Sequence, residues 1–318
     1  MAMDKSNFDL FYANQLQPFF QSLQAESHQA KRYLRAALLC LIGCLLFGIG
    51  YITDTISSYS LLVAILFGIT AIGNASIFYE KRSSFQQQFK SKIIRRIIEH
   101  IQSDLTYDPE GSISSKDYQW SSLYRIKYDY FEGEDLIAGN YKGVPFTCCE
   151  LHTVNDNEYS KFHGTCFKGM FFKAPIHPLY QAGTYIWLRN QEQLPVSIAD
   201  EEYRMYPMPT VHPIRFQHPT FENIYSVYGS DTTEAYHLLT EERMNRIIAF
   251  MQTIQKPISF SFVAGNCYVA MPFKENLFEP YHHDIANREV VKSYFTTILL
   301  MLSIIPALQL DQLQQTPH

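Results

Sequence analysis

Charged residues are absent from two long stretches near the N-terminus of the chain. Residues 36–53 and 55–79 contain no Asp, Glu, Lys or Arg, and only Asp54 stands between them. A helix rises 1.5 Å per residue, so about 20 apolar residues cross about 30 Å of hydrocarbon. The lack of charge argues against a solvated surface for these stretches. The sequence therefore predicts a transmembrane helical hairpin over 34–79 with a polar tip at 53–60.

Lysine and arginine are also missing from the tip between the two apolar runs. Basic residues flank the hairpin instead, at Lys31, Arg32, Arg35, Lys81, Arg82, Lys90, Lys92, Arg95 and Arg96. The positive-inside rule assigns such flanks to the cytoplasm, so both termini are expected there. The first run begins deep in the chain and has no small-residue cleavage site after a short core, which argues against a cleaved signal.

Cysteine is scarce, with 6 residues in the chain. Cys40 and Cys44 lie in the first apolar run, and the other four lie in the part expected in the reducing cytoplasm. Adjacent residues of a strand point to opposite faces, so a disulfide between Cys148 and Cys149 is not expected. These thiols are interpreted as small buried side chains.

The common catalytic signatures are missing as well. The chain has no Gly-rich loop ending in Lys-Ser or Lys-Thr, no His-Glu-x-x-His helix and no Gly-x-Ser-x-Gly elbow. Many enzymes assemble a site from scattered residues, so a membrane-bound hydrolase stays as an alternative. A transport subunit is a further alternative, although neither apolar run carries an ionisable residue and Asn74 is their most polar side chain.

The strongest group of metal-binding residue types is Cys148, Cys149, His152, His163 and Cys166. Its spacing differs from that of zinc ribbons, which pair two cysteines across a tight knuckle. His282, His283 and Asp284 are neighbours whose side chains diverge in an extended segment. The sequence therefore predicts no metal site, no cofactor and no catalytic residues.

Carboxylates gather at two places. Glu132, Glu134 and Asp135 surround Gly133, where a solvated acidic turn is expected and a cation site or a general acid is the alternative. Asp231 and Glu234 form a second candidate pair, although Ser230 and Asp231 also suit a loop whose side chains bond to its own backbone. One arrangement would argue for an enzyme instead. It is a deep polar pocket with shifted pKa values lined by Asp135, Glu150, His152 and Cys166.

Amphipathic segments flank the hairpin. The N-terminal segment 1–33 and the basic segment 80–106 both have apolar residues at helical spacing, and Pro18 marks a kink or a helix start. The two faces can bury each other as a stalk, and an interfacial helix on lipid is the alternative. The stripes consist of Phe8, Phe11, Tyr12, Leu16, Phe19, Phe20 and Leu23 upstream and of Phe85, Phe89, Ile93, Ile94, Ile97, Ile98 and Ile101 downstream.

The remaining segment, 107–318, has the pattern of a cytoplasmic α+β domain. Short β-rich runs predict strands at 135–141, 144–151, 165–172, 184–188 and 221–228. Residues 198–217 are interpreted as a surface loop. Thr240 can cap a helix that ends at Pro257, and 258–262 and 267–271 alternate around Gly265-Asn266 as a hairpin.

The apolar stretch 293–310 also approaches spanning length and can be a third span. Its apolar residues lie on one helical face and Ser and Thr dilute the other, which favours a core helix of the soluble domain. Aromatic residues make up 15% of the chain, but its net charge of -5 lacks the basic field that nucleic acid needs, so no nucleic-acid partner is expected.

Several motifs of the soluble part resemble one bacterial membrane-protein family, domain of unknown function 3137. They are 134–139 with Gly143 and 150–151, then 167–172, 221–231, Glu234-Ala235, Leu239-Thr240 and 258–262. The resemblance implies an inner-membrane protein with two N-terminal spans and a cytoplasmic α+β domain. It supplies no catalytic residues.

The fold class predicted is α+β, with a transmembrane hairpin, cytosolic helical extensions and a mainly antiparallel sheet with packed helices. The functional interpretation is a membrane-tethered cytoplasmic binding or scaffolding module. Its expected partners are the lipid bilayer and a protein in or at the membrane.

Overall fold

The computed structural model describes residues 5–53, 59–158, 163–189, 211–280 and 287–315. The chain divides into two compact units. The first comprises Met1–Arg96 and Glu279–Ser293, and the second comprises Ile97–Phe278 and Tyr294–His318. Each unit is described by itself.

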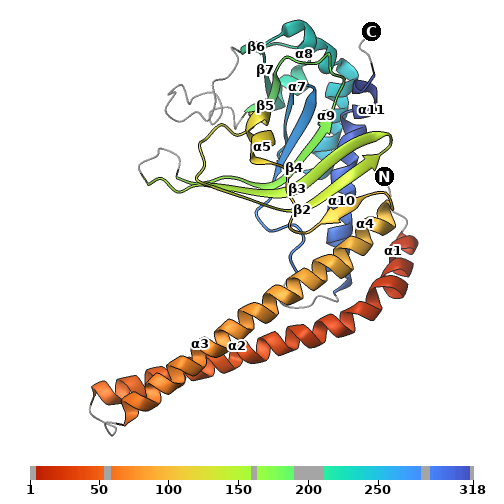
Figure 1. Cartoon of the computed structure of the whole chain (residues 1–318). Helices are drawn as coiled ribbons and strands as arrows, with labels where there is room; N and C mark the ends of the chain where they lie inside the picture. The colour runs from red at the N-terminus through yellow and green to blue at the C-terminus, as the bar shows by residue number, and fades with distance from the viewer. Residues whose placement is uncertain (1–4, 54–58, 159–162, 190–210, 281–286, 316–318) are drawn as a thin grey trace. The chain divides into compact units, whose positions relative to one another are not determined.

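The first unit is a long helical hairpin (Figure 1). Pro18 lies at the start of α2, where its fixed φ suits a first helical turn. The helices run antiparallel and each carries a π-helical segment outside the apolar run. The elements are α1 (Lys5–Phe11), η1 (Tyr12–Leu16), α2 (Gln17–Ile52), α3 (Ser60–Phe89) and η2 (Lys90–Ile94), and η2 continues into α4 (Arg95–Ile101).

The apolar parts of α2 and α3 present large hydrophobic side chains to the outside. Leu39 is 68% exposed and Ile72 is 70% exposed. The few polar groups bond within their own helix, as where Asn74 Nδ2 donates to the Thr70 carbonyl at 2.8 Å. Apolar surface on the outside and satisfied polar groups are what a lipid environment requires of a helix.

The two helices of the hairpin approach closely at Gly43. A Cβ atom at this position would lie 2.9 Å from the Phe67 ring, so only glycine permits the contact. Phe67 also stacks on Phe47 with ring centroids 5.8 Å apart. Toward the other end, Arg96 lies 3.9 Å above the Phe19 ring, and Gln88 donates to Glu26 at 2.6 Å. The hairpin is thus a packed helix pair along its length.

The amphipathic stripes that flank the apolar runs are largely buried. Tyr12, Phe19 and Ile101 are half-buried, and the other members of both stripes are buried. The protein itself therefore covers most of the apolar face of both segments. By length and composition, Leu23–Ile52, Ser60–Ile101 and Arg288–Ala307 can each cross a membrane.

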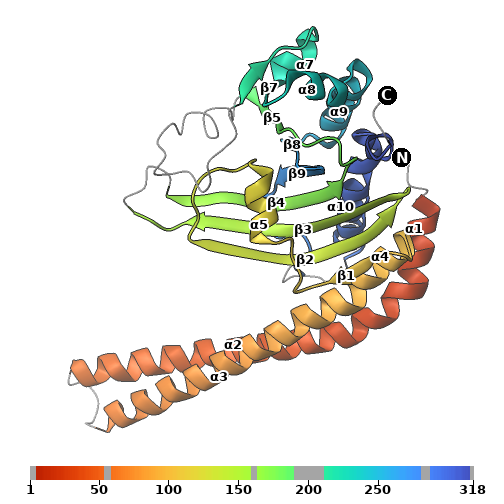
Figure 2. The same ribbon diagram turned by 45° about the horizontal axis from the view of Figure 1, so that its top comes forward.

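The second unit contains one sheet built from the nine strands of the described residues, in the order β1-β2-β3-β4-β9-β8-β5-β7-β6 (Figure 2). All neighbouring strands pair antiparallel. The strands are β1 (Thr106–Asp108), β2 (Tyr130–Tyr141), β3 (Val144–Asn155), β4 (Gly164–Pro175), β5 (Thr184–Leu188), β6 (His212–Ile214), β7 (Tyr225–Gly229), β8 (Ser259–Val263) and β9 (Asn266–Pro272). This sheet and the N-terminal apolar helices confirm the α+β class.

Short helices connect and cover the strands. Side chains cap four of the described helices: Ser114 accepts from Asp117 N–H, His218 from Phe221 N–H, Asp231 from Glu234 N–H and Thr240 from Arg243 N–H. The cap at Thr240 is the one that the sequence predicts. The helices are α5 (Ser115–Ser121), α7 (Pro219–Ile224), α8 (Thr232–Leu238), α9 (Glu241–Ile254), α10 (Arg288–Ala307) and α11 (Leu310–Leu313).

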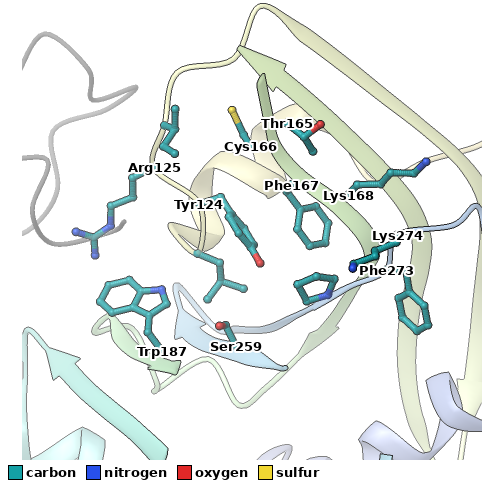
Figure 3. Close-up of a pocket in the computed structure, with 13 residues that line it drawn as sticks. Tyr124, Arg125, Thr165, Cys166, Phe167, Lys168, Trp187, Ser259, Phe273 and Lys274 are labelled. Carbon is teal, nitrogen blue, oxygen red and sulfur yellow. The ribbon is translucent and has the colours of Figure 1, made fainter. Parts of the chain in front are cut away.

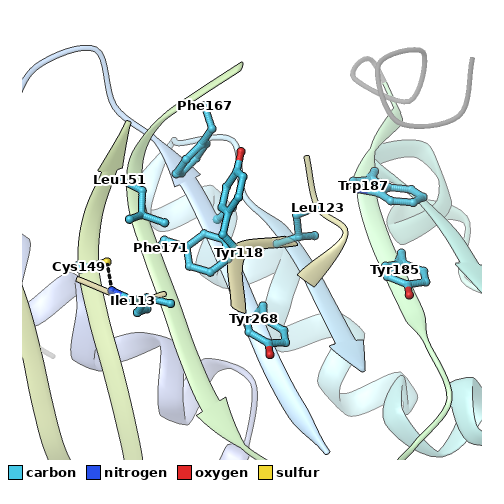
Figure 4. Close-up of a cluster of buried hydrophobic side chains, with 11 residues drawn as sticks. Ile113, Tyr118, Leu123, Cys149, Leu151, Phe167, Phe171, Tyr185, Trp187 and Tyr268 are labelled. Atoms are coloured by element: carbon cyan, nitrogen blue, oxygen red, sulfur yellow. Dashed lines mark hydrogen bonds between the residues drawn. The ribbon is translucent and has the colours of Figure 1, made fainter. Parts of the chain in front are cut away.

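Tyr118 of α5 is the centre of an aromatic core on one face of the sheet (Figure 4). It is 1% exposed, its hydroxyl bonds to Thr153 Oγ1 at 3.0 Å, and its ring lies 5.4 Å from that of Phe171. Cys149 of β3 belongs to the same cluster, where its sulfur accepts from Ile113 N–H at 3.3 Å. The core therefore fixes α5, and the segment that follows it, against β3, β4 and β9.

The stretch 293–310 is mainly the helix α10. Tyr294, Ile298 and Leu302 on its predicted apolar face are buried, and Tyr294 packs against Phe278 of the same unit. The carbonyl of Leu308, just beyond α10, accepts from buried Arg243 at 2.9 Å. These contacts favour a packed core helix.

Three local predictions are wrong. Residues 221–228 do not form one strand, because His218 caps a helix, α7, that occupies the first four of them before β7 begins. The described end of 198–217 contains strand β6. Glu132, Glu134 and Asp135 lie within β2 and not in a turn, because the strand absorbs an irregularity between Glu134 and Ile137.

Candidate functional site

A pocket of about 440 Å3 lies on the sheet face that carries α5 (Figure 3). We call it the Trp187 pocket. One wall is the segment 123–126 that follows α5, and the others come from β4, β5, β8 and the end of β9. Its lining residues are Leu123, Tyr124, Arg125, Ile126, Thr165, Cys166, Phe167, Lys168, Trp187, Ser259, Pro272, Phe273 and Lys274.

Apolar side chains form most of the wall of this pocket. Leu123, Phe167 and Trp187 extend the aromatic core around Tyr118. The ring of Tyr124 packs on Phe167 with centroids 4.7 Å apart, and burial raises the pKa of the Tyr124 phenol above its ordinary range. Tyr124 is therefore neutral and serves as a hydroxyl group on an apolar wall. A cavity of this size and lining is typical of a small-molecule site.

Trp187 contributes a buried donor to the pocket. The residue is 1% exposed, and its indole Nε1 has no hydrogen-bond partner among the described residues. In Figure 3 this nitrogen points toward the middle of the pocket. A buried donor without an acceptor costs about 1–3 kcal/mol, so this N–H favours a ligand that supplies an acceptor.

The charged groups that line the pocket are all cationic: Arg125, Lys168 and Lys274. The Arg125 guanidinium lies over the Trp187 ring with its carbon 4.5 Å from the centroid, and 5.5 Å from that of Tyr185. Figure 3 shows Arg125 and Trp187 at one end of the pocket and both lysines at the other. Among the described residues that line the pocket there is no carboxylate, so these side chains attract negative charge.

A polar cavity of about 350 Å3 lies nearby and shares Lys168 with the pocket. We call it the Glu150 cavity. Its lining residues are Glu132, Gly133, Glu134, Glu150, His152, Lys168 and Asn276. One oxygen from each of Glu134, Asp135 and Glu150 lies within 4.8 Å of the others. Oxygen-rich groups of this kind can hold a hard cation such as Mg2+ or Ca2+.

The strand irregularity in β2 brings these carboxylates together. Asp135 has φ +62°, a backbone conformation that Asp tolerates better than most residues, and Tyr107 donates its hydroxyl to the Asp135 carboxylate. The Leu277 N–H donates to Glu150 at 2.7 Å. A β-bulge thus re-aims Asp135 toward Glu150, as bulges do near many functional sites.

Burial raises the pKa of Glu150 to about 7, and the neighbouring Glu134 and Asp135 carboxylates add to the rise. The Leu277 N–H and Lys168 oppose it without cancelling it. A carboxyl group that titrates near neutral pH can donate or accept a proton. The Glu150 cavity therefore offers acid–base chemistry that the Trp187 pocket lacks.

The structure does not bring the Cys and His group together. Cys148 and Cys149 are buried on opposite faces of β3, His163 is exposed, and Cys166 lines the Trp187 pocket. His152 lines the Glu150 cavity. The triplet of His282, His283 and Asp284 lies outside the described residues.

The four residues whose convergence would argue for an enzyme are divided as well. Glu150 and His152 line one cavity, Cys166 lines the other, and Asp135 lies beside Glu150 without lining either one. The second carboxylate pair serves the fold, because Asp231 caps α8 and Glu234 accepts from the backbone N–H groups of Gln181 and Ala182 at 3.2 Å each.

Another cavity of about 440 Å3 lies beside α7, and its polar groups also serve the fold. Arg189 donates to the Glu222 carbonyl at 2.8 Å, and His218 accepts from Phe221 N–H at 3.2 Å. The Trp187 pocket is the better candidate because its indole donor has no such role.

Sequence reasoning missed Tyr124, Arg125, Trp187 and Lys274. These residues come from separate segments that only the folded sheet brings together. The one available signal was the scarcity of tryptophan, since the chain has 2 and one of them is in the pocket.

The family model described as Protein of unknown function (DUF3137) matches residues 165–310. The match confirms the resemblance predicted from the sequence. The matched range includes Trp187 and Lys274 of the pocket. It begins after Arg125 and after the carboxylates of Glu134, Asp135 and Glu150. With the apolar helices, it fits a membrane-associated protein of unassigned role.

No curated protein matches the chain. Among solved structures, the mycobacterial trehalose monomycolate transport factor A, TtfA, is similar with 11% sequence identity and a TM-score of 0.33. The match covers 70% of this chain and 94% of that chain. A likeness of this size fixes neither the fold nor the ligand of this chain.

Proposed function

We propose that the chain is an integral protein of the bacterial inner membrane whose cytoplasmic part is a binding module. The Trp187 pocket is the binding site. The observation that carries this proposal is a buried indole donor without an acceptor in an apolar pocket. Binding modules hold a ligand by shape, apolar contact and a few polar groups, and the pocket supplies all three.

The placement in the membrane rests on the exposed apolar hairpin. Side chains such as Leu39 and Ile72 are more than two-thirds exposed, which is unfavourable in water and favourable in lipid. Basic residues flank both outer ends of the hairpin, so both termini are cytoplasmic in this proposal. The bilayer is then one partner, and a protein in or at the membrane is the second.

Membrane placement is tested by fractionation and by reporter fusions to the full chain. We expect the protein to stay with membranes in alkaline carbonate and to dissolve only with detergent. A C-terminal reporter should be active when it requires the cytoplasm, and a reporter in the tip at 54–58 should be active only when it requires the other side. A soluble chain, or a far end outside the cytosol, would contradict the proposal.

Binding is tested with tryptophan fluorescence, because the chain has 2 tryptophans and they report different places. Trp120→Phe leaves Trp187 in the pocket, and Trp187→Phe leaves Trp120, which is 50% exposed and lines no part of the pocket. The probe is 12-bromododecanol, whose bromine quenches indole on contact, added to the full chain in lipid nanodiscs.

We expect saturable quenching of Trp187 and little quenching of Trp120. Equal quenching of both indoles would mean that the probe only partitions into lipid or onto the surface. Absence of quenching at Trp187 would show that the pocket does not take an apolar ligand. Either result overturns the binding proposal.

A membrane-bound enzyme is the second candidate, and the Glu150 cavity favours it. Three carboxylates lie within 4.8 Å, and one of them titrates near neutral pH. The test is hydrolase activity across broad substrate classes, with and without a chelator. Glu150→Gln should abolish a genuine activity, while Glu132→Gln, an exposed residue of the same cavity, should retain it. Inertness of the wild-type chain would exclude this candidate.

A further inference from the structure

We infer that the Trp187 pocket selects an anionic single-chain amphiphile, with its acidic head at the Arg125–Trp187 end and its chain along Leu123 and Phe167. This inference rests on the proposed binding function and names the class of ligand. The shared chemistry of the head is a carboxylate or a phosphate, both of which accept hydrogen bonds and carry negative charge.

The donors around one end of the pocket define the head site. The Trp187 N–H is buried and has no acceptor among the described residues, and it points toward the middle of the pocket. In Figure 3 the Tyr124 hydroxyl also points inward, and Ser259 lies close by on β8. A head group that only accepts hydrogen bonds matches this set.

Charge decides between a neutral and an anionic head. Arg125 lies over the Trp187 ring, 4.5 Å from its centroid, and the described residues that line the pocket carry cationic groups and no carboxylate. Hydrogen bonds to a charged group are stronger than those between neutral groups. A cationic head would meet Arg125 at this end and Lys168 and Lys274 at the other, and it would be repelled at both.

The volume and the walls define the tail. Water occupies about 30 Å3 per molecule, so 440 Å3 holds about fifteen non-hydrogen atoms. Dodecanoate has about that number of atoms, which makes it a matched probe. Its chain would run from the head site past Phe167 toward Phe273, and Leu123 and Pro272 also line the pocket. The stems of Lys168 and Lys274 add apolar surface at the far end of the pocket.

The experiment measures quenching of Trp187 in the full-length Trp120→Phe chain in nanodiscs. The four probes are 12-bromododecanoate, 12-bromododecyl phosphate, 12-bromododecanol and 12-bromododecyltrimethylammonium. Each is titrated into the parent chain and into Arg125→Gln, Arg125→Lys, Lys127→Gln and Lys274→Gln. Lys127 is an exposed residue two positions away that does not line the pocket, so it is a matched control for the lost charge.

We expect Arg125→Gln to weaken binding of the anionic probe about tenfold, the typical worth of one charge-assisted hydrogen bond. Arg125→Lys should restore much of that affinity, and Lys127→Gln should change it less than about twofold. Binding of the alcohol should be unchanged in all variants. Since partition into lipid depends on the probe and not on the variant, these ratios isolate the head site.

Three other results would contradict the inference. Equal weakening of the alcohol and the anions by Arg125→Gln would mean a structural role for Arg125, and the inference fails. A larger loss from Lys274→Gln than from Arg125→Gln would place the head at the other end and overturn the assignment. Saturable binding of the alcohol without any preference for anions would leave the binding function intact and refute the ligand class. The two anionic probes distinguish a carboxylate from a phosphate.

Discussion

The Trp187 pocket and the Glu150 cavity share Lys168 but have opposite chemistry. The pocket has aromatic and aliphatic walls with cations at its ends, whereas the cavity has three glutamates among its lining residues. The pocket adjoins the aromatic core around Tyr118, and the cavity lies beside the strand irregularity that follows Glu134. Packing therefore shapes one site and backbone conformation shapes the other.

This contrast separates binding from acid–base chemistry within one sheet. An apolar pocket with a few donors holds an amphiphile without changing it. A cluster of carboxylates with a raised pKa can move a proton or hold a cation. Substitutions in one site, with measurements on the other, test whether the two sites are independent.

Tyr118→Ala should produce the largest effect. The substitution deletes a ring that is 1% exposed and packs against Phe171, so we expect a loss of about 4 kcal/mol of unfolding free energy. Tyr118→Phe keeps the ring and loses only the bond to Thr153, at a cost of about 1 kcal/mol. Chemical denaturation of the detergent-solubilised chain measures both. If Tyr118→Ala costs no more than Tyr118→Phe, the pocket does not depend on this core.

Glu150→Gln should change how stability depends on pH. The folded protein keeps the Glu150 proton up to about pH 7, whereas the unfolded chain loses it near 4.5. The folded state therefore binds more protons between these values, and stability is highest below 4.5 and falls as pH rises to 7. Burial is the main cause of the raised pKa, and the decline in unfolding free energy between these two pH values is about 3 kcal/mol.

Glu150→Gln should remove that decline, so the variant should be more stable than wild type at pH 8 and no more stable at pH 4. Thermal unfolding across this pH range measures it, with Glu132→Gln as the control from the same cavity. A wild-type profile that is flat between pH 4.5 and 7 would contradict the assignment.

Cys166 should react slowly with alkylating reagents. Burial raises the pKa of its thiol to about 11 from an ordinary value of 9, so at pH 8 the thiolate is about 100-fold less abundant than in an exposed cysteine. The rate of labelling by N-ethylmaleimide should rise tenfold per pH unit up to about 11. Mass spectrometry of a chain lacking Cys40 and Cys44 measures it. Bound dodecanoate should slow the labelling of Cys166 further, because Cys166 lines the pocket. Labelling as fast as a free thiol would contradict this placement.

Lys168→Gln should have the smallest effect and tests the residue that both sites share. Lys168 is the smallest of the influences on the pKa of Glu150 and lowers it, so the loss of Lys168 should shift the pH dependence of stability slightly toward higher pH. Quenching of Trp187 by 12-bromododecanol should not change. A large effect on that quenching would mean that the two sites are not separate.

The sequence predicted the parts of the fold that depend on local patterns. The helix capped by Thr240 and the hairpin at Gly265 follow from periodicity and turn residues, and both are present. The strand at 184–188 has the predicted bounds. The segment 221–228 failed because its β-rich residues also suit a short helix once His218 caps it.

Local sequence patterns could not predict the two candidate sites. Glu132, Glu134 and Asp135 looked like a solvated turn because no pattern reveals that Asp135 adopts φ +62° inside a strand. Trp187 becomes a pocket residue only through the pairing of β5 with β7 and β8 and through the position of the segment after α5. Contacts of this kind join residues far apart in the chain.

The most direct test of the account is the position of a bromine atom in crystals of the full chain grown with 12-bromododecanoate. The account predicts an anomalous peak inside the Trp187 pocket near Phe273, with the carboxylate toward Trp187 and Arg125. A peak beside Glu150, or peaks only along the apolar surface of the hairpin, would contradict it.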